Sequence, residues 1–402
     1  MINKFFLIFL LSLPFQVHAS KLNEINAFNF TEEQIQLAIE IIQTLESNHL
    51  VKKEYREIKY EAFEVFIERL DPNKNIYTDK EVLKVLSNIK TESGIKEDLQ
   101  VAYDLFNKYI DRYQERYEVQ IEFLKEVDEE DLQGDRKIER SLSEASRQIS
   151  SEALRGLWQD LSTNDVIQLM LAGNSLDESV EKTIKRMNNQ LNYFQQTRGE
   201  DVFNIFVNSI ASIYGPHTSY MSPKTSEDFD INMSLSLEGI GALLSSDGLY
   251  TSISSLVPGG PAEKTDLLKP EDKIIGVGQD AEGEIVDVIG WRIDDVVDLI
   301  RGPKGSKVRL EIIPSTALSD TETKEVEIIR NVVKLEDQAA EKKILSLTRN
   351  NKEYKVGVIQ LPAFYFDFDA FQKRDLDYKS SSKDVKRLLK ELKILNVDGL
   401  VF

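Results

Sequence analysis

The hydrophobic period of this chain changes near residue 212, and that change constrains the fold more than any other feature. Before it, apolar residues recur three and four positions apart, as they do on one face of a helix. After residue 235, short apolar runs alternate with glycine turns, which is typical of strands. We therefore expect a helical domain and then a β-rich domain. Turn formers at residues 214–217 (YGPH) and 221–223 (MSP) predict a linker between them.

The helical part begins with a clear start signal. Residues 31–34 (TEEQ) form a capping box sequence. Three apolar stripes follow at helical spacing, and we interpret them as core faces rather than as cofactor sites. The stripes are Ile35, Ile39, Ile42 and Leu45; then Phe106, Tyr109, Ile110, Tyr113, Tyr117 and Ile121; then Val180, Ile184, Met187, Leu191 and Phe194. The charged residues 127–140 predict a solvated face or a helix break.

The β-rich part contains one helix among its strands. We expect strands at residues 239–244, 249–253, 273–277 and 307–313. Residues 290–301 (GWRIDDVVDLIR) have apolar side chains at helical spacing, and Gly302-Pro303 follows as a stop signal. A final segment predicts a strand at residues 355–361, a helix at 381–395 and a strand opening at Val397. This is the beginning of a βαβ unit, and Phe402 lies inside its second strand. We expect the sequence to be truncated there.

The N-terminus has the three parts of a secretory signal. Lys4 supplies a positive charge, residues 5–15 are mostly apolar, and Val17 and Ala19 are the small residues before a cleavage site. The apolar run is short for a membrane span, although a retained anchor is the alternative. We expect a mature chain that starts at Ser20 in the periplasm of a Gram-negative bacterium, with association with the membrane as an alternative.

Charge and cysteine content exclude several functions. The net charge of -19 leaves no basic surface to neutralise phosphates, so we do not expect nucleic acid as a partner. The chain has no cysteine, which excludes disulfides, a thiol nucleophile and a thiolate metal site. No cluster of histidine and carboxylate residues suggests a metal, and we expect no cofactor.

Four motifs carry a family resemblance. SLEGIGA (236–242), PGGPA (258–262), DKIIGV (272–277) and GPKGSKV (302–308) resemble, in order, the PDZ domain of the tail-specific C-terminal processing proteases. LDP (70–72) and PHTSYMSP (216–223) resemble the N-terminal region of that family, and VVKLED (332–337) resembles its hinge. Gly215 departs from the Asp that the family usually has before Pro-His-Thr.

The resemblance implies a multidomain α+β protein. Its parts would be a signal peptide (1–19), a helical N-terminal domain (20–230) and a PDZ domain (231–335). The start of an α/β crotonase-like, ClpP-like protease core (336–402) would follow.

The implied binding site is a groove for protein C-termini. Gly239 and Gly241 would let a loop point several N–H groups at a free carboxylate. The peptide would add as a strand beside residues 242–244, with its last apolar side chain against the helix. We expect about half of the four apolar helix positions to face the groove. The candidate contacts are Gly239, Ile240, Gly241, Ala242, Leu244, Ile293, Val296, Val297 and Ile300.

The implied chemistry is that of a serine endopeptidase. The family uses a Ser nucleophile activated by a Lys, whose pKa must be lowered by burial, and an oxyanion hole that follows the strand opening at Val397. We expect the Ser and the Lys downstream of Phe402, so no catalytic residue is assigned and the chain itself should be inactive.

Substrates and partners follow only from the resemblance. It implies protein substrates with apolar free C-termini, cell-wall enzymes among them, and a helical-repeat lipoprotein as an adaptor. Two other functions compete. A non-catalytic periplasmic PDZ scaffold would not need a βαβ core. A trypsin-like stress protease would have a Gly-rich Ser loop before the PDZ domain, where this chain has charged helices.

Overall fold

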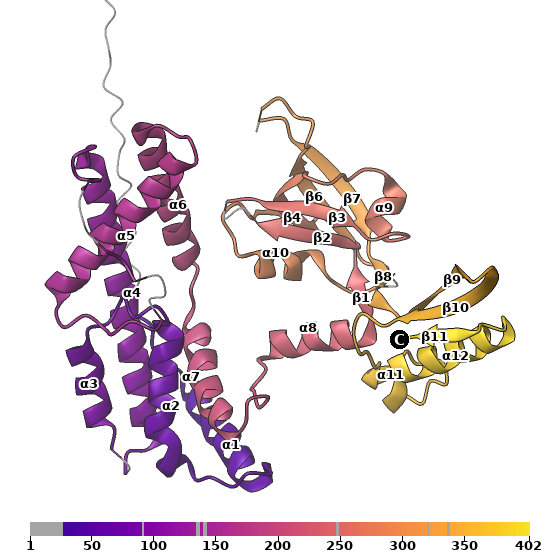
Figure 1. Cartoon of the computed structure of the whole chain (residues 1–402), viewed down its shortest axis with the longest axis horizontal. Coiled ribbons are helices and arrows are strands. Elements are labelled where there is room, and N and C mark those ends of the chain that lie inside the picture. The colour runs from indigo at the N-terminus through magenta and orange to yellow at the C-terminus, as the bar shows by residue number, and fades with distance from the viewer. Residues whose placement is uncertain are drawn as a thin grey trace, which may run out of the picture.

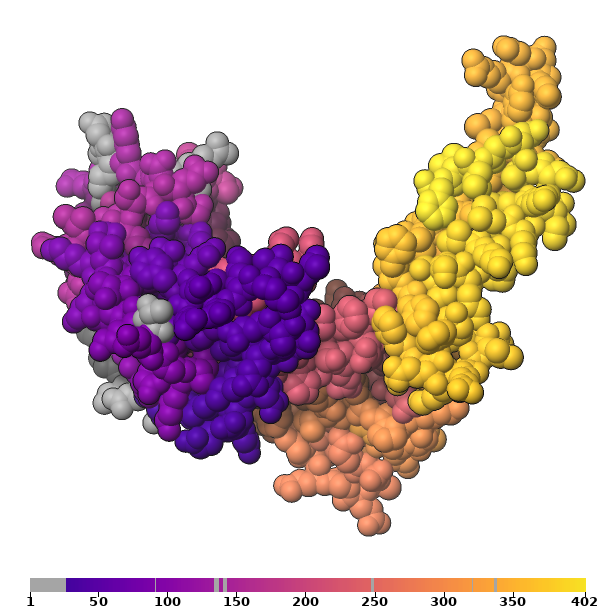
Figure 2. Space-filling view, turned by 90° about the horizontal axis from the view of Figure 1, so that it is seen from below, coloured from indigo at the N-terminus to yellow at the C-terminus, as the bar shows by residue number. Residues whose placement is uncertain are grey.

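A computed structural model describes residues 27–90, 92–133, 137–139, 143–246, 249–319, 321–335 and 338–402. Along the chain it has a helical region, a β-rich domain and a small α/β unit (Figure 1). The helical region and the α/β unit rise on either side of an open space, with the β-rich domain at its base (Figure 2). The predicted signal peptide, residues 1–19, lies outside the described residues.

The helical region is built around one long helix, α4 (Ile95–Glu126). Its first half joins a core with α1, α2 and α7, and its second half joins a smaller core with α5 and α6. The bounds of the other helices are α1 (Glu32–Asn48), α2 (Tyr55–Leu70), α3 (Asp79–Asn88), α5 (Ser151–Leu171), α6 (Leu176–Phe194) and α7 (Gly199–Tyr214). No helix in the described part of the chain is both long and apolar enough to cross a bilayer.

The helix signals read from the sequence are confirmed. The Thr31 hydroxyl accepts a hydrogen bond from the Gln34 N–H at 3.2 Å, and the Gln34 side chain accepts one from the Thr31 N–H. All three apolar stripes lie in the two helical cores. The helix break is also found, because α4 ends at Glu126 where the charged segment starts.

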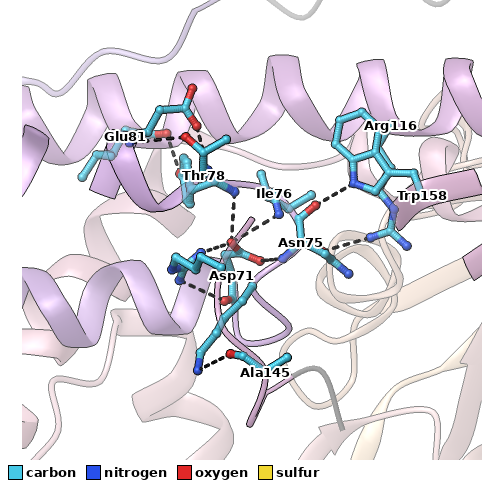
Figure 3. A network of polar contacts seen from close by, with 12 residues as sticks. Asp71, Asn75, Ile76, Thr78, Glu81, Arg116, Ala145 and Trp158 are labelled. Carbon is cyan, nitrogen blue, oxygen red and sulfur yellow. Dashed lines mark hydrogen bonds and ion pairs between the residues drawn. The ribbon is translucent and has the colours of Figure 1, made fainter. Parts of the chain in front are cut away.

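A buried carboxylate organises the loop between α2 and α3 (Figure 3). Asp71 is 1% exposed and accepts hydrogen bonds from the N–H groups of Asn75, Ile76 and Tyr77 at 2.8, 3.3 and 3.1 Å. It also forms an ion pair with Arg147. Since a buried charge is stable only when it is paired and hydrogen-bonded, Asp71 fixes this loop against the segment before α5.

The same loop ties α5 to the rest of the region. The Asn75 carbonyl accepts a hydrogen bond from the indole N–H of Trp158, in α5, at 2.7 Å. The Asn75 side-chain oxygen accepts one from Arg116, in α4, at 3.2 Å. The motif LDP at residues 70–72 therefore has a structural role in this chain.

The predicted linker is partly a helix. Residues 221–223 were read as turn formers, but Ser222 is the N-cap of α8 (Pro223–Ser234), with its hydroxyl 3.3 Å from the Thr225 N–H. Pro223 occupies the first helical position, where its missing N–H costs nothing. The helix runs from the helical region to the β-rich domain (Figure 1).

The β-rich domain is a sheet with strand order β2-β3-β4-β6-β7, and β5 pairs with β4. A separate two-stranded ribbon, β1 with β8, leads into and out of it. The bounds are β1 (Ser236–Gly239), β2 (Ala242–Ser246), β3 (Thr251–Leu256), α9 (Pro261–Thr265), β4 (Lys273–Gln279), β5 (Ile285–Asp287), α10 (Ile293–Ile300), β6 (Lys307–Ile313), β7 (Lys324–Ile329) and β8 (Asn331–Lys334).

The segment predicted as a strand at 239–244 is divided at the loop that the two glycines imply. The chain leaves β1 at Gly239 and turns at Gly241, whose φ is +75°. It then enters β2 in a different sheet. The turn matters because it forms one end of the groove described below.

The last unit confirms the predicted βαβ beginning. β10 (Lys352–Gln360) and β11 (Gly399–Val401) are parallel neighbours, and α12 (Ser381–Ile394) connects them with Leu388 and Leu392 buried. A further strand, β9 (Glu341–Arg349), pairs antiparallel with β10 and was not predicted. A short helix, α11 (Phe368–Gln372), precedes α12.

We expect Asp71→Asn to lower the free energy of unfolding of the helical region by about 3 kcal/mol. The change leaves the guanidinium of Arg147, whose side chain is only 11% exposed, without its carboxylate partner. Urea unfolding followed by far-UV circular dichroism measures this. The control is Asp104→Asn, an exposed change on α4 that should cost less than about 0.5 kcal/mol. Equal effects of the two variants would contradict the assignment of Asp71 to this role.

Candidate functional site: the groove between β2 and α10

A groove of about 220 Å³ lies between β2 and α10. It is lined by the predicted residues Gly239, Ile240, Gly241, Ala242, Leu244, Ile293, Val297 and Ile300. The structure thus brings together two segments that are about fifty positions apart in the sequence. Further lining residues that the sequence did not single out are Lys224, Asp228, Leu237, Leu243, Asp294 and Arg301.

Val296 is the exception among the predicted contacts. It is fully buried in the core of the β-rich domain and does not line the groove. In a helix, positions 293, 297 and 300 follow one face while 296 points about a quarter turn away, toward the sheet. The assignment of Val296 to the site is therefore corrected, and three of the four helix positions line the groove rather than the expected half.

The turn at the start of β2 directs N–H groups toward the groove edge. The carbonyls of Ile240 and Gly241 accept hydrogen bonds from the N–H groups of Ala262 and Val257 at 2.8 and 2.9 Å. Because the C=O and N–H of a trans peptide point in opposite directions, the N–H groups of Gly241 and Ala242 face away from these partners. The Gly241 N–H donates no hydrogen bond to another described residue. The two donors can bind an anion there.

Of the two glycines predicted to form the carboxylate-binding loop, only one has a left-handed backbone conformation. Gly241 has φ +75°, and a Cβ there would lie 3.3 Å from the Gly260 Cα and 3.3 Å from a Val333 methyl. Gly239 ends β1 without a positive φ, and its constraint is the nearness of the Leu237 side chain at 3.2 Å. The turn conformation therefore depends on Gly241.

The long side of the groove is an open strand edge. β2 is the last strand in the sheet order, and no described strand pairs with its outer edge. Such an edge can accept an additional strand through main-chain hydrogen bonds. Leu244 of β2 and, across the groove, Ile293 and Val297 of α10 are each half-buried and present apolar surface. The arrangement suits an extended peptide with an apolar side chain.

A buried arginine fixes the end of α10 against the sheet. Arg330, between β7 and β8, is 2% exposed. Its guanidinium donates to the carbonyls of Ile300 and Leu299 at 2.8 and 3.0 Å and to the Gln279 side chain at 2.6 Å. Burial lowers the pKa of Arg330 from its usual value, and Asp280 opposes the shift. No local pattern in the sequence predicts this role of Arg330, because its partners are distant along the chain.

Helix α8 supplies charged residues at the groove rim. Arg301 follows α10 and donates to the Asp228 carboxylate at 2.7 Å. Lys224 forms an ion pair with Asp298. Lys224 and Asp228 lie outside the predicted boundary of the β-rich domain at residue 231, so sequence reasoning missed them.

The other side of α10 contacts the helical region. Arg292 forms an ion pair with Asp201 at 2.9 Å, and Arg198 forms one with Asp295. The Gln196 side chain donates to the Gly290 carbonyl at 2.7 Å. Burial acts to lower the pKa of Arg292, but Asp201 and the aspartates of α10 outweigh it, so the pKa is raised.

A second, larger cleft adjoins the groove. It has a volume of about 820 Å³ and lies between α8, residues 301–303 and α11. Leu237 and Arg301 line both spaces. The smaller groove is the better candidate site, because it combines free backbone donors, an open strand edge and apolar side chains.

The described residues contain no group of three or more histidine, aspartate or glutamate side chains placed to hold a metal. The groove itself contains no nucleophile beside a base. The groove therefore offers contacts for non-covalent binding rather than groups for bond cleavage.

Comparisons with known proteins match two stretches of the chain. Residues 41–224 match the tail specific protease N-terminal domain family, and residues 228–313 match the PDZ domain family. The chain is 35% identical over 378 residues to a tail-specific protease of Haemophilus influenzae, which covers 92% of this chain and 50% of that protein. It is 27% identical over 256 residues to the carboxy-terminal processing protease CtpA of Bacillus subtilis, covering 55% of this chain and 52% of that protein.

One solved structure is similar to the β-rich domain. It is the PDZ domain of a carboxy-terminal protease from Vibrio cholerae in complex with peptide, 52% identical, covering 25% of this chain and 99% of that chain with a TM-score of 0.24. The chain spans about half the length of the curated relatives that it matches.

We expect Gly241→Ala to lower the stability of the β-rich domain by about 2 kcal/mol, because it adds crowding to an unfavourable φ. Hydrogen exchange of the β3 and β4 amides in urea measures this. Gly259→Ala is the matched control, with φ +74° and nothing within 4 Å of the added Cβ, and it should cost about 1 kcal/mol. If the two variants were equally stable, contact with Gly260 and Val333 would not constrain the turn.

Proposed function

We propose that the groove recognises the apolar C-terminal tails of proteins, because residues 41–224 match the N-terminal domain of tail-specific proteases and residues 228–313 match a PDZ domain. The whole protein would be a periplasmic serine endopeptidase that degrades or processes the proteins so recognised. The observation that carries the proposal is the pair of outward N–H groups, of Gly241 and Ala242, at the closed end of an apolar groove.

The geometry supports a free carboxylate as the ligand. Two backbone donors at the N-terminal end of β2 would hold it, and the Arg301 guanidinium lines the same groove. Charge-assisted hydrogen bonds of this kind are about twice as strong as neutral ones. With its carboxylate at this end of β2, the bound tail would run antiparallel to the strand.

The terminal side chain would enter the apolar part of the groove. Val297 and Ile300 lie toward the C-terminal end of α10, which is also the end near the turn, because Arg301 lies 3.9 Å from the Cβ position of Gly239. Burying an apolar side chain there contributes about 25 cal/mol for each Å² removed from water. Apolar terminal residues should therefore bind best.

The proteolytic step is supported by the relatives rather than by this groove. Relatives that match 92% and 55% of the chain are named as tail-specific or carboxy-terminal processing proteases. The chain also has a βαβ unit, β10-α12-β11, outside the β-rich domain, which a PDZ binding scaffold would not need. We assign no nucleophile or base to a residue of this chain.

We expect the chain to bind a peptide that ends in Ala-Leu with a free carboxylate at least about tenfold more tightly than its C-terminally amidated twin, since the amide loses charge-assisted hydrogen bonds. Fluorescence anisotropy with labelled peptides measures this. A free-acid peptide that ends in Ala-Asp is the control for the apolar pocket and should bind weakly. Equal affinity for acid and amide would exclude the proposed carboxylate site.

Export is a separate expectation. Residues 1–30 fused to alkaline phosphatase, which is active only after export, should give active enzyme, because they contain the apolar run of a secretory signal. The same fusion with Leu10→Arg and Leu11→Arg should be inactive. An inactive unmodified fusion would contradict a periplasmic location.

A further inference from the structure

We propose that Asp294 makes the groove select tails that carry a basic side chain two positions before the terminal residue. The proposal rests on the proposed function, since it needs a tail bound beside β2. It adds a charge preference to an otherwise apolar recognition and names the residue responsible.

The direction of the bound tail decides which of its side chains comes close to Asp294. The terminal residue lies near the turn, beside the C-terminal half of α10, so upstream residues run toward the start of the helix. Side chains two apart on a strand point the same way and are about 6.6 Å apart. One turn of α10, from Val297 back to Ile293, is about 6 Å. The side chain two positions upstream therefore comes to the first turn, at Ile293 and Asp294.

A row of charged side chains follows one side of α10, and one of its carboxylates forms no ion pair with another described residue. Asp294, Asp298 and Arg301 follow each other along one side of the helix at four and three residue steps. Helix α8 engages the second and third of these through Lys224 and Asp228. Asp294 lies one turn beyond these contacts, is exposed, and makes no hydrogen bond or ion pair with another described residue.

The neighbouring charges are already paired. Arg292 forms its ion pair with Asp201, although Asp294 and Asp295 also act on it electrostatically. Asp295 is paired with Arg198. Of the charged residues that line the groove, Lys224 and Arg301 each have a carboxylate partner and Asp228 has its arginine. A basic group on the tail would therefore meet Asp294 as the available carboxylate of the groove.

A long basic side chain also fits the apolar surface next to Asp294. Ile293, half-buried, lines the groove next to it. Lysine and arginine can pack their aliphatic stems on such a surface while the charged head stays in water. A glutamate at this tail position would instead place a like charge beside Asp294.

The test uses the whole chain and free-acid peptides of sequence Gly-Ser-Gly-Ala-Ser-X-Ala-Leu, with X lysine, glutamine or glutamate. At low ionic strength we expect the lysine peptide to bind about fivefold more tightly than the glutamate peptide, and 0.5 M salt to reduce this ratio. Asp294→Asn should reduce the ratio to below about twofold, and an unchanged midpoint of urea unfolding, followed by circular dichroism, shows that the variant is folded.

Asp266→Asn is the matched control. It removes the same charge from the same domain, away from the groove, at a residue with φ +54° that asparagine tolerates. This control should keep the full lysine preference. A lysine moved one position, next to the terminal leucine, should bring less gain, because that side chain points the other way.

The outcomes separate the two proposals. If the chain does not distinguish free acid from amide, the proposed function fails. If it does, but binds lysine and glutamate peptides equally, or keeps the preference in Asp294→Asn, only the role of Asp294 is overturned.

Discussion

The buried guanidinium of Arg330 holds together the parts on which the groove depends. It lies where β7 passes into the β1-β8 ribbon, and it donates to carbonyls at the end of α10. It also donates to the Ser306 hydroxyl at 2.9 Å, at the start of β6. Because a buried cation with several carbonyl partners has few alternative positions, the separation of α10 from the sheet is fixed at this end. The width of the groove follows from that separation.

The opposite side of α10 contacts other parts of the molecule. Ion pairs from Asp201, Arg198 and Lys224 hold the helix to the helical region and to α8. Exposed pairs of this kind are individually weak and are screened by salt. Two different kinds of contact therefore hold α10 beside the groove. One is a tightly packed core and the other is a set of surface contacts that ionic strength can loosen.

The sequence predicted what depends on local pattern. The capping box at Thr31, the apolar stripe of α10 and the β10-α12-β11 order all follow from residue spacing, and the structure has them. The parts it missed depend on distant partners. Arg330 cannot be recognised without Ile300 and Gln279 beside it, and Val296 could be assigned to the core only once the sheet face was known. Helix α8 is different, because Ser222 followed by Pro223 is both a turn former and a helix start signal, and the structure has the helix.

The most direct test of the account is a crystal structure of the chain with a peptide that ends in Ala-Leu and a free carboxylate. We predict that the peptide lies antiparallel to β2, with its carboxylate within hydrogen-bond distance of the Gly241 and Ala242 N–H groups and its leucine against Val297. A peptide bound in the opposite direction, or in the larger cleft between α8 and α11, would contradict the central claim.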